Sequence, residues 1–331
     1  AQAIKNGASL TARACRSLEA RLRIAMTGTP VENGADDLVS ILRFANPELM
    51  SGPIERAFRA TGGEGGFALL ARTARPFILR RTKESVLSEL PPKTETDLFV
   101  EFDDEAGDEY KRLVAYYRAQ LSQALTEEGL RANAARVLEA LLRLRQFACH
   151  PGLLDPNRID ESSPKVELLL EQLKPILENG RKALVFSQFR KFLEIVARHL
   201  DKAGVRYEMF HGGTKDRSAV VDRFQSNDEC PVLLVTLKAG GLGLNLTAAD
   251  YVFLLDPWWN PAAEAQAIDR AHRIGQTRPV FAYRMVARGT VEERVLALQR
   301  EKRAVAQELV PEGTTRLGTL TVEDLRQLLD G

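Results

Sequence analysis

Two arginines three residues apart, Arg270 and Arg273, follow Gln266 in the stretch 263–276. On a helix, side chains at positions i, i+4 and i+7 share one face, so these three long polar groups would project together. Two adjacent guanidinium groups repel each other unless an anion neutralises them, and the planar fork of arginine suits a phosphate. The spacing therefore indicates an anion site, with a surface helix carrying solvated arginines as the alternative.

The residues that flank this stretch predict a helix over 261–274. Asn260 is a good N-cap, Pro261 suits the first helical position, and Gly275 suits the position just after the helix. Small residues on one face would let this helix pack closely against a sheet. The residues of that face are Ala263, Ala267, Ala271 and Ile274.

A glycine-rich loop over 235–250 follows an apolar strand and is a second candidate for ligand binding. Loops at the carboxyl ends of parallel strands are where α/β sheets bind ligands, and Gly241 and Gly243 would let a backbone approach a phosphate. A plain turn is the alternative, because a glycine cluster alone is a weak signal. The side chains of this loop that suit a sugar-phosphate backbone are Thr236, Lys238, Asn245 and Thr247.

Short apolar runs alternate with helical patterns through the second half of the chain. This alternation predicts a doubly wound α/β domain, with a parallel sheet covered on both faces. Ser163 and Pro164 form an N-cap and first-turn pair at the start of its first helix. The strands that we predict are 183–187, 207–212, 232–236, 251–256 and 280–287.

The rest of the chain differs from this domain. Long helical patterns dominate the middle, where strand-like character is limited to 96–102, and the polar stretch 155–163 indicates a linker. The beginning holds one strand candidate, 22–26, and one helix, 34–45, which are too few elements for a domain. We therefore predict four regions: 1–50, a mostly helical 51–158, the α/β domain 159–310 and a helical tail 311–331.

Composition narrows the class of protein. The 331 residues carry a net charge of +1, so nucleic-acid binding would need a locally basic surface. The three cysteines, Cys15, Cys149 and Cys230, have no metal-ligand spacing and no disulfide pattern, so we expect no metal site and a reducing, intracellular setting. No apolar run is long enough to span a bilayer, and we expect no signal peptide.

Seven segments in order along the chain resemble the motifs of Swi/Snf-type ATPases, a group of DNA translocases within helicase superfamily 2. The segments are AQAIKN (1–6), MTGTPVEN (26–33), FILRRTKESVLSELPPKTE (77–95), LLRLRQFACHP (141–151), KALVFSQF (182–189), VTLKAGGLGLNLTAAD (235–250) and DPWWNPAAEAQAIDRAHRIGQ (256–276). The resemblance implies a RecA-like fold of the P-loop NTPase type. It also implies that two such lobes close over ATP while they grip double-stranded DNA.

The resemblance assigns roles residue by residue. Arg270 and Arg273 are expected to act as arginine fingers on the transferring phosphoryl group, with Gln266 helping to organise the hydrolysis site. Trp259 is either a DNA contact or a core aromatic at the hinge between lobes. Contacts to ATP are expected from Gly241, Gly243, Asn245 and Gln2. Contacts to DNA are expected from Ser187, Gln188, Gly212, Thr236 and Lys238.

The sequence departs from the family pattern in one respect, since no GxxxxGK[ST] phosphate loop occurs and no Asp-Glu pair precedes Ala1. We therefore expect ATP and Mg²⁺ to be held mainly by an N-terminal lobe of the same polypeptide, and the isolated chain to lack ATPase activity. The expected function is the motor half of a DNA-dependent ATPase that remodels a protein–DNA complex. Its expected location is the cytoplasm at the bacterial nucleoid, or the nucleus in a eukaryote.

Two other functions stay open at this point. The first is a stand-alone nucleic-acid-binding or regulatory module without hydrolysis, which would leave Arg270 and Arg273 without a purpose. The second is a different α/β nucleotide-binding enzyme, which would need a phosphate loop of its own.

Overall fold

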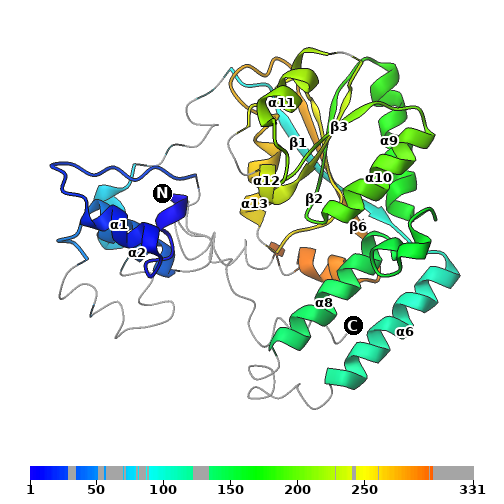
Figure 1. Cartoon of the computed structure of the whole chain (residues 1–331), viewed down its shortest axis with the longest axis horizontal. Helices are drawn as coiled ribbons and strands as arrows, with labels where there is room; N and C mark the ends of the chain where they lie inside the picture. Colours follow the sequence, from blue (N-terminus) through cyan, green and yellow to red (C-terminus); the bar gives the residue numbers. More distant parts are fainter. Residues whose placement is uncertain are drawn as a thin grey trace. The chain divides into compact units, whose positions relative to one another are not determined.

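The computed structural model describes most of the chain, and it divides into two compact units (Figure 1). The first is built mainly from residues 1–88 and the second mainly from 89–298. The described residues are 1–28, 35–50, 56, 70, 72–79, 81, 87, 89–121, 134–227, 229–240, 244–259, 261–297 and 299–300. Within them, no helix is both long and apolar enough to cross a membrane.

The second unit contains a six-stranded sheet whose strands are all parallel, in the order β1-β6-β5-β2-β4-β3. The predicted α/β fold is therefore confirmed. Two of the predicted strands end earlier than expected, at Phe210 and Leu254. The strands are β1 (Lys93–Val100), β2 (Ala183–Ser187), β3 (Tyr207–Phe210), β4 (Val232–Thr236), β5 (Tyr251–Leu254) and β6 (Val280–Ala287).

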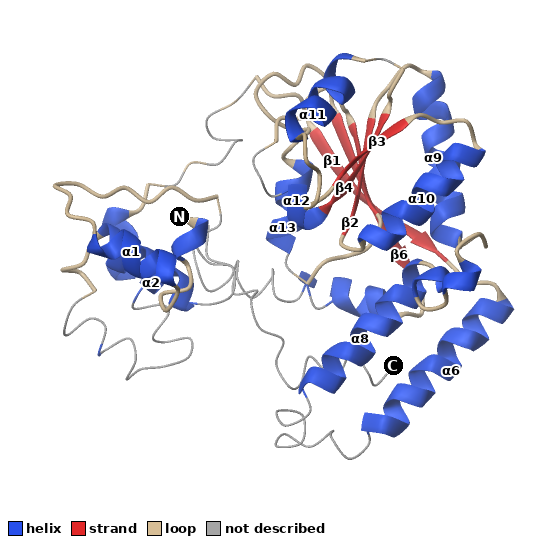
Figure 2. Ribbon diagram, in the orientation of Figure 1, coloured by secondary structure: helices blue, strands red, loops and turns tan. Residues whose placement is uncertain are grey.

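Helices cover both faces of this sheet (Figure 2). One face packs against α9 (Pro164–Glu178) and α10 (Arg190–Lys202) around a core that includes Phe253. The other packs against α11 (Arg217–Ser226), α12 (Leu237–Gly240) and α13 (Pro261–Ile268). Strands β2 and β4 are buried along their whole length, which explains why both read as unbroken apolar runs.

Strand β1 joins the sheet although the sequence analysis placed its residues in the helical region. It pairs with β6 along its full length, from Lys93 opposite Val280 to Val100 opposite Ala287. Strand β1 contains four exposed residues, so its pattern lacks the apolar run of a central strand. It is an edge strand, and this position explains why periodicity did not assign it to the α/β domain.

Two long helices, α6 (Asp104–Leu121) and α8 (Ala134–Cys149), pack together in the second unit. Their shared core contains Leu141 and Leu144 but leaves Leu138 and Leu142 exposed, so only two of the four leucines of α8 are buried. The other core residues are Tyr110, Leu121, Val137, Ala140, Phe147, Val291 and Val295. Helix α6 is therefore fastened to α8 and to the helix at 291–297.

The stretch 155–163, predicted to be a linker, is an ordered turn in the structure. It contains the 3-10 helix η5 (Pro156–Arg158). The guanidinium of Arg158 donates to both carboxylate oxygens of Glu109 on α6, at 2.7 and 2.9 Å, and to those of Glu161, at 2.9 Å. Polar composition predicted a linker here, but the polar groups pair with one another and hold α6 in place.

The first unit contains short helices: η1 (Gln2–Ile4), α1 (Leu10–Ser17), α2 (Ala35–Ala45) and η2 (Arg75–Phe77). The predicted helix at 34–45 is confirmed as α2, but the predicted strand at 22–26 is wrong. Its alternating apolar residues, Leu22, Ile24 and Met26, are exposed, and none of the described residues pairs with it as a strand. A strand needs a neighbouring strand for its backbone groups, and here the carbonyl of Met26 instead accepts from the amino group of Ala1 at 2.7 Å.

A buried ion pair joins the sheet to the helices of the second unit. The ammonium group of Lys165, at the start of α9, lies 2.7 and 2.6 Å from the two carboxylate oxygens of Glu292. It also donates to the carbonyl of Leu255 at 2.6 Å, while Glu292 accepts from the backbone N–H of Ala287 at 3.0 Å. Both side chains are almost completely buried, so neither charge has water as a substitute partner.

We predict that Lys165→Met lowers the free energy of unfolding by roughly 3–5 kcal/mol, because it leaves the Glu292 carboxylate buried without its partner. Urea unfolding of the 331-residue chain measures this loss. The control is Lys111→Met, which removes an exposed lysine paired with Asp108 and should cost less than about 1 kcal/mol. Equal losses in the two variants would contradict the prediction.

Candidate functional site

Helix α13 carries the start of the predicted anion site but ends at Ile268, earlier than predicted. Beyond that residue, the carbonyl of Arg270 accepts a hydrogen bond from the N–H of Leu246 at 3.0 Å. The carbonyl of Ala271 accepts one from the Gln276 side chain at 3.1 Å. Neither carbonyl bonds to the i+4 N–H group that would continue a helix, and the chain forms turns that carry both arginines.

The prediction of one helix over 261–274 is therefore wrong at its carboxyl end. Gly275 does adopt a positive φ of 100°, but it ends a turn and not a helix. Asn260, the predicted N-cap, lies outside the described residues. The small-residue face is confirmed for Ala267 and Ala271, which are buried, whereas Ile274 is 68% exposed because the helix ends before it.

Gln276 is the residue that joins this turn to the glycine-rich loop. Its buried side-chain amide donates to the carbonyls of Thr247 and Ala249, at 3.1 and 2.8 Å, in addition to Ala271. Its carbonyl oxygen accepts from the N–H groups of Thr277 and Arg278, each at 3.0 Å. One side chain thus bonds to five backbone groups. It connects the glycine-rich loop to the turn at 269–276, which we call the arginine turn.

The two arginines face different surroundings within this turn. Arg270 is half-buried, and its Nε atom is buried without a hydrogen-bond partner among the described residues. Burial lowers the pKa of the Arg270 guanidinium, and the neighbouring positive charge of Arg273 lowers it further, against the opposing charge of Asp269. Arg273 is exposed and Gln266 is half-buried. The structure therefore holds two cations close together, which an anion would stabilise.

The glycine-rich loop is only partly described. Gly241 and Gly243, predicted to approach a phosphate, lie outside the described residues. Asn245 is exposed, and its backbone carbonyl accepts a hydrogen bond from the Gln225 side chain at 3.2 Å. Thr236 is buried at the end of β4, and Lys238 is exposed on α12. Of these residues, Asn245 and Lys238 present side chains to solvent.

A second polar centre lies at the carboxyl end of β5, where Asp256 is fully buried. The hydroxyl of Ser187 donates to its carboxylate at 2.5 Å, and the N–H of Gln188 donates to it at 3.2 Å. Ser187 is itself fully buried, so its hydroxyl shapes the turn after β2 and does not reach the surface. Its assignment as a DNA contact is a prediction that this geometry does not support.

Arg145 on α8 also belongs to this polar centre, although the sequence analysis assigned it no role. It is 2% exposed, and its guanidinium donates to the carbonyl of Pro257 at 2.6 Å and to the side-chain oxygen of Gln188 at 3.2 Å. It lies 3.7 Å from the Asp256 carboxylate. Burial lowers the pKa of Arg145, and the charge of Asp256 opposes that effect. Arg145 thus ties a helix of the predicted helical region to the turn and the loop at the sheet edge.

Three aromatic rings enclose the Arg145 guanidinium. Their centroids lie 5.0 Å away for Trp259, 5.5 Å for Trp258 and 5.9 Å for Phe189, distances at which a ring attracts a cation. Trp259 is half-buried and also packs on the core between α6 and α8. Trp259 thus packs as a core aromatic, while its predicted contact with DNA stays a prediction.

The remaining predicted residues are spread over both units. Gly212 is exposed after β3, where its carbonyl accepts from Arg217 at 3.2 Å. Gln2 is exposed on η1 in the first unit. Among the described residues, no cluster of His, Cys, Asp or Glu could hold a metal ion.

Buried Glu264 fixes α13 to the neighbouring elements. One carboxylate oxygen accepts from the N–H of Trp258 at 2.6 Å, and the other accepts from Arg284 of β6 at 2.8 Å. Arg284 also pairs with Asp97 of β1. The helix that leads to the arginine turn is therefore braced by the loop before it and by the sheet edge.

Comparison with known proteins identifies the family of the chain. A profile described as "SNF2-related domain" matches residues 1–153, and one described as "Helicase conserved C-terminal domain" matches residues 164–275. The double-stranded-DNA complex of the Sulfolobus solfataricus SWI2/SNF2 ATPase core is 31% identical, with a TM-score of 0.60 over 99% of this chain and 70% of that one. The chain belongs to the Swi/Snf family.

Curated relatives match nearly the whole chain. An uncharacterised ATP-dependent helicase of Mycoplasma genitalium is 36% identical over 100% of this chain and 32% of its own length. The ISWI chromatin-remodelling complex ATPase ISW1 of Saccharomyces cerevisiae is 32% identical over 96% of this chain and 30% of its own length. The chain thus spans about a third of the length of these relatives.

We predict that Arg145→Met lowers the free energy of unfolding by roughly 3–5 kcal/mol and increases acrylamide quenching of tryptophan fluorescence. The chain contains two tryptophans, Trp258 and Trp259, so its emission reports on the rings around Arg145. The control is Arg143→Met, on the same helix but half-exposed. Unchanged quenching in Arg145→Met would contradict the assigned contacts.

Proposed function

We propose that this chain is the second half of the motor of a DNA-dependent ATPase that translocates on double-stranded DNA and remodels protein–DNA complexes. The observation that carries the proposal is the arginine turn, where Gln276 ties Arg270 and Arg273 to the glycine-rich loop. When bound, ATP supplies the phosphoryl group whose transfer to water drives the motor. Arginines held in place before the reaction stabilise the charge that develops there.

The surroundings of Arg270 fit such a role. Its buried Nε–H has no partner among the described residues, and a buried unpaired donor is costly unless a ligand accepts from it. Arg273 adds a second, solvent-accessible guanidinium, and Gln266 lies on the helix leading to both. We assign Arg270 and Arg273 to the γ-phosphate and Gln266 to the organisation of the hydrolysis site. Gly241, Gly243, Asn245 and Gln2 remain proposed ATP contacts.

The described residues offer Mg²⁺ no binding site comparable to the arginine turn. No described group of carboxylates is arranged to hold a metal ion. We propose that Mg²⁺, together with most contacts to ATP, belongs to an N-terminal lobe of the same polypeptide. No step through the metal follows from the residues described.

The DNA side of the motor is proposed at the carboxyl ends of the strands. Exposed Lys238 and Gly212 and half-buried Gln188 lie after β4, β3 and β2 respectively. Parallel strands present these ends at one edge of the sheet, where a lysine and backbone groups can bind phosphates. The Sulfolobus relative, whose core was solved with double-stranded DNA, supports this partner. We also propose that the motor acts on a DNA-bound protein and works at the bacterial nucleoid, or in the nucleus of a eukaryote.

The alternative is a stand-alone nucleic-acid-binding or regulatory module. It would have no use for a half-buried arginine whose Nε lacks a partner, next to a second arginine. A buried donor without a described partner, beside a second positive charge, suits an anionic ligand, so this arrangement favours the motor.

We predict that Arg270→Ala or Arg273→Ala in the full-length protein lowers DNA-stimulated kcat about a thousand-fold or more, the effect of removing an arginine finger. Phosphate release measured against ATP and DNA concentration separates this loss from weaker binding. Arg198→Ala, an exposed arginine on α10, is the matched control and should keep normal turnover. Normal turnover in both finger variants would refute their assignment.

We also predict that the isolated 331-residue chain releases phosphate no faster than background, with or without double-stranded DNA. The reason is that it holds no recognised phosphate loop. Adding purified N-terminal lobe as a separate polypeptide should restore DNA-stimulated release. DNA-stimulated ATPase of the isolated chain that is lost in Arg273→Ala would overturn the expectation.

A further inference from the structure

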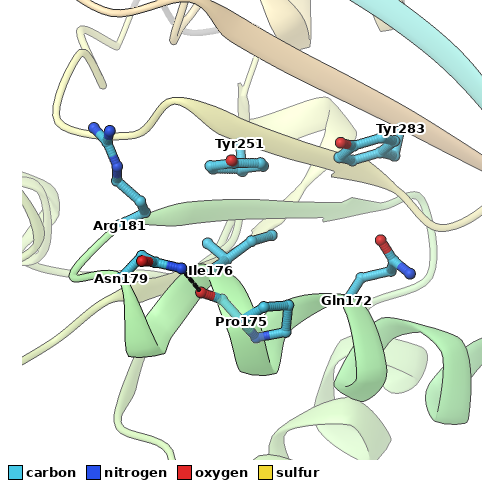
Figure 3. A pocket seen from close by; sticks show the side chains of 7 residues that line it. All are labelled: Gln172, Pro175, Ile176, Asn179, Arg181, Tyr251 and Tyr283. Atoms are coloured by element: carbon cyan, nitrogen blue, oxygen red, sulfur yellow. Dashed lines mark hydrogen bonds between the residues drawn. The ribbon is translucent and has the colours of Figure 1, made fainter.

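A cavity of about 400 Å³ opens on the α9 face of the sheet, at the amino ends of β2 and β5 (Figure 3). We call it the tyrosine pocket. Its lining residues are Gln172, Pro175, Ile176 and Asn179 from the end of α9, Arg181 before β2, Tyr251 of β5 and Tyr283 of β6. The pocket shares no residue with the arginine turn, which packs on the other face of the sheet, or with the proposed DNA edge at the opposite strand ends.

One side of the tyrosine pocket is aromatic. The rings of Tyr251 and Tyr283 are inclined by 18° with centroids 6.4 Å apart, and each also stacks on a phenylalanine. Figure 3 shows both rings on one side of the pocket, with Pro175 and Gln172 on the other. Neither tyrosine hydroxyl has a hydrogen-bond partner among the described residues. A ring surface that ends in a free hydroxyl suits an apolar group beside a polar one.

The charged group of the pocket is Arg181. Its Nη1 atom lies 3.1 Å from a carboxylate oxygen of Asp250, which is 3% exposed. Asp250 also lies in the field of Arg278, and both arginines oppose the rise in its pKa that burial causes. Arg181 thus pairs directly with this carboxylate, whereas Arg278 acts on it only through its charge, and none of the seven lining residues is acidic. Arg181 is therefore the charged side chain of the pocket: the buried Asp250 carboxylate holds it in place, and its partly exposed guanidinium can still donate to a ligand.

These features exclude two kinds of occupant on physical grounds. Nucleic acid requires several cations along its phosphates, whereas this pocket has one lining cation beside a carboxylate. A small cofactor is usually buried over most of its surface, whereas both tyrosines and Gln172 remain partly exposed on an open face. An extended peptide suits an open aromatic surface, and proline lowers the entropy lost on binding because it favours the extended conformation.

We propose that the tyrosine pocket binds an extended, proline-containing peptide segment of a partner protein that carries a carboxylate. The carboxylate pairs with Arg181, and the proline ring packs against Tyr251 and Tyr283. The tyrosine hydroxyls and the Gln172 amide donate to carbonyl groups of the peptide. Because the pocket lies away from the arginine turn, the partner would tether or regulate the motor without competing for ATP or DNA.

Fluorescence anisotropy with the 331-residue chain tests this directly. Three labelled octapeptides of alternating sequence, Pro-Glu, Pro-Gln and Pro-Lys, differ only in charge. The Pro-Glu peptide should bind at least about ten-fold more tightly than Pro-Gln, since one ion pair with a partly buried guanidinium is worth about 1.4 kcal/mol or more. The Pro-Lys peptide should not bind. Equal binding of Pro-Glu and Pro-Lys would overturn the proposal.

Variants locate the binding. Arg181→Gln should abolish the preference for Pro-Glu over Pro-Gln, and Arg181→Lys should keep part of it. Tyr283→Ala should weaken both peptides about ten-fold, with thermal unfolding confirming that each variant folds. Arg206→Gln, which removes an exposed arginine paired with Glu229 at another surface hollow, should change nothing.

Two further measurements keep the proposal separate from the motor function. Full-length Arg181→Gln should retain normal DNA-stimulated ATPase, whereas a loss of that activity would place the pocket in the motor and overturn the proposal. Binding of a labelled DNA duplex or of ATP that is lost in Tyr283→Ala would assign the pocket to nucleic acid or nucleotide, with the same consequence. Peptide binding is measured by anisotropy in the absence of ATP. Its result therefore does not depend on whether the proposed motor function is correct.

Discussion

Buried Asp256 sets the geometry at the carboxyl ends of β2 and β5, because a carboxylate without water must be fully paired. Ser187 and the backbone N–H of Gln188 bond to it from the turn after β2, and Arg145 approaches from α8. Each of these elements is therefore fixed relative to the end of β5. The tryptophans of the following loop then close over Arg145, so one charge organises a turn, a loop and a helix.

The same principle connects the arginine turn to the rest of the second unit. Glu264 is buried and bonds to Arg284 of β6 and to the N–H of Trp258, so α13 begins from the loop that also encloses Arg145. At the other end, Gln276 satisfies backbone groups of the glycine-rich loop. Buried polar groups are costly when unpaired, and these pairings leave few alternative arrangements for the residues between them. The proposed ATP and DNA sides thus share a continuous polar framework.

Sequence patterns predicted the parts of this fold that depend on local periodicity. The central strands β2 and β4 read as apolar runs because both of their faces are buried, and helix α9 begins at Pro164 after its Ser163 cap, as expected. Strand β1 was not assigned to the sheet because it is a partly exposed edge strand. The early end of α13 was not predicted either. It coincides with hydrogen bonds from Leu246 and Gln276, which sequence spacing does not reveal.

The sequence predicted some residues of the candidate site and missed the contacts of others. Residue type and spacing pointed to Arg270 and Arg273, because two arginines that share one helix face are a local pattern that suits an anion. Arg145 stood in a recognised motif among leucines, and an arginine on an apolar helix face is itself a signal of a buried partner. Its partners, however, lie 43 and 112 residues away at Gln188 and Pro257, so only the fold reveals what it holds. Residues that would touch a ligand carry a local signature, whereas residues that position them are defined by contacts across the sequence.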